Sequence, residues 1–320
     1  MSEEPTETKN DTVDATETKT SEFPTKAGFV ALIGAPNAGK STLMNLLVGA
    51  KVSIVTHKVQ TTRAIMRGIA MKDNCQIIFV DTPGIFKPRR KLDEAMVTTA
   101  WGGAKDADIT VFLLDVERGI TDDLPRILQG VGNIPGRKVL LLNKIDQIQR
   151  DKLLALSEAA NGMAEFDATF MMSALKGDGS EEFMQYLVDN LPEGPLLYPE
   201  DQISDIPMRQ LAAEITREKL FLRLHQELPY ASHVETENWT EKEDGSVKIE
   251  QAIYIERDSQ KKILIGKNGA TIKAISMAAR KEIGEILDQT VHLFLFVKVR
   301  ENWGNDPERF REMGLEFPRK

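Results

Sequence analysis

The sequence predicts an α/β domain with a mostly parallel sheet, followed by a smaller α+β domain. In the first half, short apolar runs alternate with helical stretches, and several of these runs end in a polar segment. The second half has the predicted order α-β-β-α-α-β. Between them, residues 197–207 are rich in proline and acidic side chains, which predicts a linker.

The first polar segment predicts a phosphate-binding loop. It follows an apolar strand at 28–33, precedes a helix, and has the pattern GxxxxGK[ST]. Its glycines let the backbone curl so that N–H groups point at phosphate oxygens, and the helix N-terminus adds positive charge. Lys40 is placed to reach the β- and γ-phosphates, and the Ser41 hydroxyl to ligate magnesium. The residues predicted to bind nucleotide here are Gly34, Ala35, Pro36, Asn37, Ala38, Gly39, Lys40, Ser41 and Thr42.

The second polar segment follows a predicted strand at 76–80 and reads Asp81, Thr82, Pro83, Gly84. A carboxylate at the end of that strand can hold magnesium through a water molecule. The Gly84 N–H can meet the γ-phosphate, so the segment is predicted to respond to whether that phosphate is present.

The last two polar segments predict which base is bound. Asn143, Lys144 and Asp146 follow a strand at 139–142. A carboxylate accepts from the N1–H and N2–H₂ of guanine, whereas adenine offers a lone pair at N1. We expect Asn143 to serve the N7/O6 side, and Lys144 to lie over the base and brace the phosphate loop. After a strand at 169–172, the segment Ser173, Ala174, Leu175 places the Ala174 N–H near O6.

Composition limits the other possibilities. No apolar run reaches the roughly 18 residues that span a bilayer. The only cysteine, Cys75, rules out an internal disulfide, and the four histidines show no metal-ligand spacing. Residues 1–26 are rich in Thr and Glu and are expected to form a disordered acidic tail.

Charge points to nucleic acid in the second half. The net charge is −8, but residues 257–300 carry nine basic and four acidic side chains, 9 − 4 = +5, which leaves −13 for the rest. Predicted helices at 208–227, 259–265 and 270–287 accompany strands at 231–239, 247–256 and 291–299.

A GxxG turn, residues 266–269, joins the last two helices, as in KH modules, where the glycines let the backbone approach single-stranded RNA. The residues predicted to bind RNA are Lys261, Lys262, Ile265, Gly266, Lys267, Asn268, Gly269 and Lys273. Ile263, Ile265 and Ile272 are expected to form an apolar floor for unstacked bases.

Three stretches are typical of one family: residues 256–269, residues 297–303, and Gln60-Thr61-Thr62-Arg63. Over residues 26–316 the chain resembles the Era family of bacterial GTPases. The resemblance implies a P-loop, Ras-like G domain at 27–196, a type II KH domain at 208–304 and a C-terminal tail at 305–320. It also implies hydrolysis of GTP to GDP and phosphate, with the nucleotide state controlling binding to the 3′ region of 16S ribosomal RNA during small (30S) ribosomal subunit biogenesis. We expect a cytoplasmic monomer with peripheral association with the inner face of the cell membrane.

The resemblance also assigns site residues. The threonine that meets magnesium and the γ-phosphate maps to Thr62, with Thr61 as the alternative. Ser41, Thr62 and Asp81 are then the magnesium set, and Lys40, Thr62 and Gly84 the catalytic set. Ras-type enzymes carry a glutamine where this chain has Ile85. Related GTPases with an apolar residue there use potassium, which makes Asn37 a candidate potassium ligand.

Two other functions remain open from the residues alone. One is an RNA-binding scaffold with a regulatory or vestigial nucleotide site, which the intact Lys40, Ser41 and Asp81 oppose. The other is an RNA-modification GTPase, which needs a further catalytic domain. Arg63 is either an arginine finger or a surface ion-pair partner. Trp303 either packs on the C-terminal segment or stacks on a base.

Overall fold

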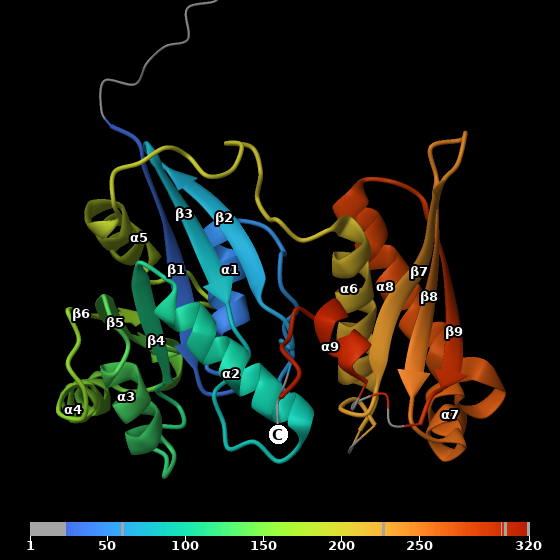
Figure 1. Ribbon diagram of the computed structural model, residues 1–320, viewed down its shortest axis with the longest axis horizontal. Helices are drawn as coiled ribbons and strands as arrows, with labels where there is room; N and C mark the ends of the chain where they lie inside the picture. The colour runs from blue at the N-terminus through green and yellow to red at the C-terminus, as the bar shows by residue number, and fades with distance from the viewer. Residues whose placement is uncertain (1–23, 59–60, 226–227, 302, 304–305, 319–320) are drawn as a thin grey trace, which may run out of the picture.

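The computed structural model describes residues 24–58, 61–225, 228–301, 303 and 306–318. It contains two sheets, each with its own helices, that lie side by side with α9 between them (Figure 1). Most of the tail expected to be disordered, residues 1–23, lies outside the described residues. Within the described residues, no helix combines the length and apolar character needed to cross a bilayer.

The first sheet has the strand order β2-β3-β1-β4-β5-β6. All neighbouring strands are parallel except the edge pair β2 and β3, so the predicted mostly parallel sheet is confirmed. The strands are β1 (Lys26–Gly34), β2 (Met66–Lys72), β3 (Cys75–Asp81), β4 (Ile109–Asp115), β5 (Arg137–Asn143) and β6 (Ala168–Met172).

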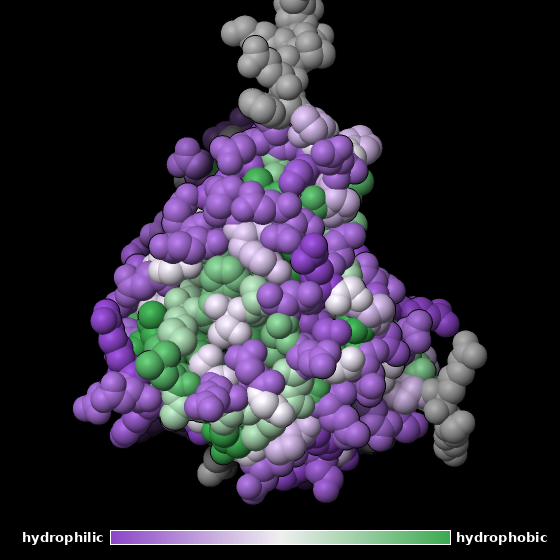
Figure 2. All heavy atoms as spheres, turned by 90° about the vertical axis from the view of Figure 1, so that its left-hand side faces the viewer, coloured by the Kyte–Doolittle hydropathy of each residue, from purple (hydrophilic) through white to green (hydrophobic). Residues whose placement is uncertain are grey.

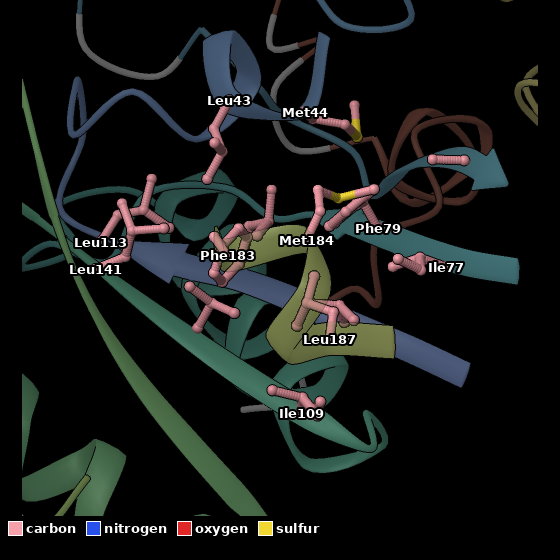
Figure 3. Close-up of a cluster of buried hydrophobic side chains, with 14 of the residues drawn as sticks. Leu43, Met44, Ile77, Phe79, Ile109, Leu113, Leu141, Phe183, Met184 and Leu187 are labelled. Atoms are coloured by element: carbon pink, nitrogen blue, oxygen red, sulfur yellow. The ribbon is translucent and has the colours of Figure 1, made fainter. Parts of the chain in front are cut away.

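Helices cover both faces of this sheet, which is why its central strands are continuous apolar runs. The helices are α1 (Lys40–Val48), α2 (Lys91–Lys105), α3 (Leu124–Gly132), α4 (Arg150–Asn161) and α5 (Ser180–Asn190), with a short 3₁₀ turn η1 (Ile145–Gln147). On one face, α1 and α5 bury side chains such as Leu43 and Phe183 against Phe79 of β3 (Figure 3). On the other, α2, α3 and α4 form a second core.

Strand β6 is the far edge of this sheet and is only partly covered. Hydrophobic side chains gather in the middle of the face at the left of Figure 1, surrounded by hydrophilic ones (Figure 2). The neighbouring α4 region contributes exposed apolar side chains, Leu154 and Met163.

The second domain has the predicted αββααβ order. Its elements are α6 (Met208–Arg223), β7 (His233–Glu241), β8 (Val247–Ile255), α7 (Asp258–Ile265), the 3₁₀ turn η2 (Lys267–Gly269), α8 (Ala270–Leu287) and β9 (Val291–Val299). Strand β8 is central, antiparallel to β7 and parallel to β9. Helices α6 and α8 pack together on the sheet through residues such as Ile215, Ile249 and Ile283.

The prediction of a helix over 208–227 was wrong at its end. Helix α6 stops at Arg223, because Leu224 is extended (φ −93°, ψ 154°). The carbonyl oxygens of Phe221 and Leu224 accept hydrogen bonds from Lys58 of the first domain. These bonds satisfy two of the groups that a helix end leaves open.

The C-terminal segment joins the two domains. Helix α9 (Pro307–Glu312) places Phe310 in a small core with Met96 of α2 and Trp303. Trp303 is 2% exposed, and its Nε1–H donates to the Ala231 carbonyl at 3.0 Å. Packing, rather than stacking on a base, is therefore its role in this structure.

Candidate functional site

A cavity of about 640 Å³ lies at the carboxyl edge of the first sheet. All four predicted polar segments contribute to its lining, represented by Lys40, Gly84, Asp146 and Ala174. The segment before β2 adds Thr62. Since parallel strands end at one edge, polar residues that are far apart in sequence meet there.

Close backbone packing shapes the phosphate loop. Gly39 has φ +96°, and a Cβ there would lie 2.2 Å from Asn143 Nδ2. A Cβ on Gly84 would lie 2.8 Å from the Pro36 Cα, so the second segment touches the loop directly. Helix α1 starts after Gly39 with no side-chain cap, which leaves its first N–H groups available to an anion.

Lys40 is held inside this loop. It is 6% exposed, and its Nζ donates to the carbonyls of Ala35 at 3.1 Å and Gly34 at 3.3 Å. Burial lowers its pKa to about 8, although the Asp81 carboxylate acts in the opposite direction. A polyphosphate beside Nζ would favour the charged form.

The three residues of the predicted magnesium set lie together. The Ser41 hydroxyl donates to Asp81 Oδ2 at 2.6 Å, and Thr62 Oγ1 lies 3.0 Å from Ser41 Oγ and 3.4 Å from Asp81 Oδ2. Asp81 is fully buried, and burial raises its pKa. Its Oδ1 has no hydrogen-bond partner among the described residues. A hard divalent cation with oxygen ligands fits this set.

Two neighbouring residues, Thr61 and Ser53, show which hydroxyl groups contact Asp81. Thr61 is not part of the magnesium set, because its hydroxyl bonds Thr56 Oγ1 and the Lys58 carbonyl. Ser53, which the sequence reasoning missed, donates to Asp81 Oδ2 at 2.9 Å. No local pattern around Ser53 signals this role.

Asp146 lines the same cavity and is hydrogen-bonded through both of its carboxylate oxygens. Its Oδ1 accepts from Ser173 Oγ at 2.7 Å and its Oδ2 from Gln147 Nε2 at 2.6 Å. These bonds, that from Ser173 above all, lower the pKa of Asp146, so the side chain is a carboxylate at neutral pH. The exposed Leu175 lines the cavity as well.

Asn143, not Lys144, braces the phosphate loop. Asn143 Nδ2 donates to the Ala38 carbonyl at 2.8 Å, and its Oδ1 accepts from the Ala174 N–H at 3.0 Å. Lys144 has a left-handed backbone (φ 69°) and its Nζ lies 2.6 Å from Asp115 Oδ2. Asp115 was missed, although it ends the apolar run of β4 as Asp81 ends that of β3.

Three residues singled out in the sequence, Thr82, Ile85 and Arg63, are all buried. Thr82 is fully buried and donates to the Leu32 carbonyl, so its side chain belongs to the core. Ile85 is buried in the core under α2 and α3. Both alternatives for Arg63 were wrong: it is 2% exposed and donates to backbone carbonyls of the second domain, including that of Ser232 at 2.7 Å.

The predicted RNA residues surround the turn between α7 and α8. Lys262, Lys267, Asn268 and Lys273 are exposed, while Lys261 and Ile265 are half-buried. The turn needs its glycines: Gly266 has φ +74°, and a Cβ there would lie 2.2 Å from the Thr271 hydroxyl.

A cavity of about 480 Å³ next to the turn is lined by Arg223, Leu224, His225, Leu228, Gln260, Ile263 and Thr271. Of the expected apolar floor, only Ile263 lines this cavity. Ile272 packs on the core instead.

Two family models match this chain. Residues 29–144 match the model of the 50S ribosome-binding GTPases, and residues 227–304 match the KH domain.

The chain is similar to known proteins over nearly its whole length. GTPase Era of Agrobacterium fabrum is 72% identical, over 93% of this chain and 94% of that protein. GTPase Era of Bradyrhizobium diazoefficiens is 61% identical, over 92% and 96%. The crystal structure of Era in complex with MgGDPNP and nucleotides 1506–1542 of 16S ribosomal RNA is 37% identical, with a TM-score of 0.87 over 91% of this chain and 99% of that one. A variant of Aquifex aeolicus Era bound to GDP and AlF₄⁻ gives a TM-score of 0.86. The chain has a P-loop GTPase domain joined to a KH domain, and these relatives match nearly all of it. It therefore belongs to the Era family of GTPases.

Proposed function

We propose that the protein binds and hydrolyses GTP and uses its nucleotide state to control the binding of 16S ribosomal RNA by the KH domain during small-subunit assembly. One observation carries this: the phosphate loop, the magnesium set and the guanine-reading segments share one cavity. The crystallised relative, in complex with MgGDPNP and 16S RNA, supports both ligands. We propose that residues 27–196 form the GTP-binding domain and residues 208–304 the RNA-binding KH domain, joined by the linker 197–207.

Some cavity residues would bind the phosphates and magnesium, and others the guanine base. Lys40 and the α1 N-terminus would hold the β- and γ-phosphates, and the Gly84 N–H would meet the γ-phosphate. Ser41, Thr62 and Asp81 would hold magnesium, which neutralises charge that develops on the transferred phosphate. Asp146 would accept from the guanine N1–H and N2–H₂, because both its oxygens are acceptors.

We propose potassium as a further cofactor, with Asn37 as one ligand. The buried Ile85 cannot polarise water, so the site lacks the side chain that Ras-type enzymes use. Asn37 lines the cavity, and its Nδ2 donates to the His57 carbonyl at 2.7 Å, which leaves the amide oxygen as an acceptor. Hydrolysis in potassium should exceed that in sodium, and Asn37→Ser should remove the difference. Equal rates in both salts would refute this role.

The KH domain would hold a single RNA strand across the turn at residues 266–269. The exposed lysines would neutralise phosphates, and the cavity beside Ile263 would receive an unstacked base. We infer a cytoplasmic protein with a peripheral membrane fraction from the family resemblance alone. Release of that fraction by high salt in cell fractionation would support it.

The test measures three quantities on the full chain. The first two are GTP turnover and the preference for guanosine over adenosine triphosphate. The third is the affinity for the 3′ segment of 16S RNA, measured once with a GTP analogue bound and once with GDP bound. We expect turnover, guanine preference and an RNA affinity that differs between the two nucleotides. Tight RNA binding without turnover would point to the scaffold alternative, and equal RNA affinity in both states would reject the coupling.

A further inference from the structure

The segment that leads to Thr62 is bonded to the second domain. We call residues 51–58 and 61–63 the switch-one segment. Lys51 Nζ lies 2.7 Å from Glu218 Oε2 on α6. The backbone N–H of Val55 donates to Glu218 Oε1 at 2.9 Å. A single carboxylate, 3% exposed, thus holds both a side chain and the backbone of this segment.

Arg217 makes a further link, directly beside Thr62. Its guanidinium donates to the carbonyl oxygen of Thr61, the residue before Thr62. That carbonyl shares one planar peptide unit with the nitrogen and Cα of Thr62. The bond therefore orients the backbone from which the Thr62 hydroxyl reaches Ser41, 3.0 Å away, and Asp81.

Stability of the fold does not by itself account for an arginine at this place. The Arg217 side chain is 1% exposed, and Nη1 has no partner among the described residues. Burial, together with the neighbouring Arg217 charge, lowers the pKa of Arg63 to about 9, although the carboxylates of Glu214 and Asp93 act in the opposite direction. A buried charge with an unsatisfied donor is often less stable than an apolar residue of similar size. The bond to Thr61 gives the arginine a role that an apolar residue could not perform.

We propose that Arg217 and Glu218 are positioning residues for the nucleotide site, which hold the switch-one backbone from the second domain so that Thr62 meets Ser41 and Asp81. The proposal rests on the proposed function, in which Thr62 contacts the metal and the γ-phosphate. Because GDP lacks the γ-phosphate, this support acts on the GTP state and not on the GDP state. It makes the second domain part of the hydrolytic machinery rather than only its RNA-binding partner.

The test uses Arg217→Gln in the full chain, with Arg209→Gln as the matched control. Arg209 is exposed in the first turn of the same helix, and its guanidinium donates to the carbonyls of Thr236 and Glu237 within the second domain. We measure kcat and KM for GTP, the magnesium concentration that gives half-maximal rate, and the affinities for a non-hydrolysable GTP analogue and for GDP. Arg217→Gln should lower kcat/KM by about tenfold, as for loss of a charged hydrogen bond, and raise the magnesium requirement. GDP affinity and the control should stay within about twofold of wild type.

Two further variants keep the test decisive. Arg217→Lys, which retains one charged donor, should restore part of the rate. Glu218→Gln, which keeps the shape but loses the charge, should act in the same direction, and it decides the matter if Arg217→Gln does not fold. Wild-type rates in both variants, or equal losses of GTP and GDP affinity, would overturn the proposal. A wild-type chain that fails to prefer guanine nucleotides would instead refute the proposed function.

Discussion

The nucleotide cavity and the glycine turn of the KH domain both have features that suit phosphates, but they differ in burial and support. In the cavity, Lys40 and Asp81 are buried and hydrogen-bonded to the chain around them. At the turn, Lys267 and Asn268 are exposed, and the glycine backbone is the specific feature. One site is organised before its ligand arrives, and the other offers an open surface.

The difference follows from the two ligands. A magnesium-bound triphosphate concentrates charge in a small volume, where preorganised groups away from water act strongly. An RNA strand spreads its charge along the backbone, and each exposed cation replaces a counterion at modest gain. Changes in the cavity should therefore have large effects, and changes at the turn small, salt-dependent ones.

The largest effect is expected for Asp146→Asn. The amide puts a donor where guanine also has donors, so GTP affinity should fall by a factor on the order of 10³ or more. Xanthosine triphosphate, which has a carbonyl at C2, should bind the variant better than GTP does. Equilibrium binding of both nucleotides to both proteins measures this. An undiminished preference of the variant for GTP would mean that Asp146 does not read the base.

The next effect distinguishes the two neighbouring threonines. Thr62→Ala should lower magnesium-dependent GTP hydrolysis by roughly 10- to 100-fold, because it removes an oxygen beside Asp81. Thr61→Ala, its matched control, removes bonds to Thr56 and Lys58 only and should change the rate by less than about threefold. Chelation of magnesium should reduce the wild-type rate to the level of Thr62→Ala or below. The reverse ranking of the two variants would reassign the metal ligand.

A smaller effect is expected at the turn. Lys267→Gln should weaken RNA binding by a few-fold and lower the salt-dependence slope by about 0.7, the value for one phosphate contact on a single strand. Lys281→Gln is the control, because Lys281 lies on α8 beside Glu285, away from the turn. GTP affinity should not change in either variant. RNA titrations at several salt concentrations test this, and equal slopes for all three proteins would exclude Lys267 from the interface.

The smallest effect concerns an ion-pair contact between the two domains. Glu282 of α8 pairs with Lys51 and Lys219. Burial would raise its pKa, but hydrogen bonds from Lys219 and Lys51 outweigh this and hold the pKa of Glu282 below its usual 4.5. A lowered carboxylate pKa stabilises the fold above the unfolded pKa, and this contribution is lost as pH falls through the folded pKa.

Thermal unfolding of Glu282→Gln over a pH series tests the contact. Its Tm should lie a few degrees below wild type at pH 7, about 2–4 °C for each kcal/mol lost, and the two curves should converge as the pH falls through the folded pKa of Glu282. Glu285→Gln, on the same helix but exposed, should follow the wild-type curve. A constant gap at every pH would show that charge is not the cause.

Much of the architecture could be predicted because its signals are local. The polar segments after apolar runs marked the strand ends around Asp81 and Asn143, and the GxxG turn marked the junction of α7 and α8. Asp115 carried the same signal at the end of β4 and could have been found by the same rule. The end of α6 could not, because its last carbonyls are satisfied by Lys58, more than 160 positions away.

The sequence by itself determined which residues form the cavity: their types and spacing were sufficient to predict a phosphate loop, a metal-binding carboxylate and a segment that recognises guanine. Only the tertiary structure decided that Thr62 rather than Thr61 joins Asp81, that Asn143 braces the phosphate loop, and that Arg63 is buried between the domains. The reason is physical. A motif depends on neighbouring residues along the chain, whereas the direction and partner of each side chain depend on distant segments that only folding brings together.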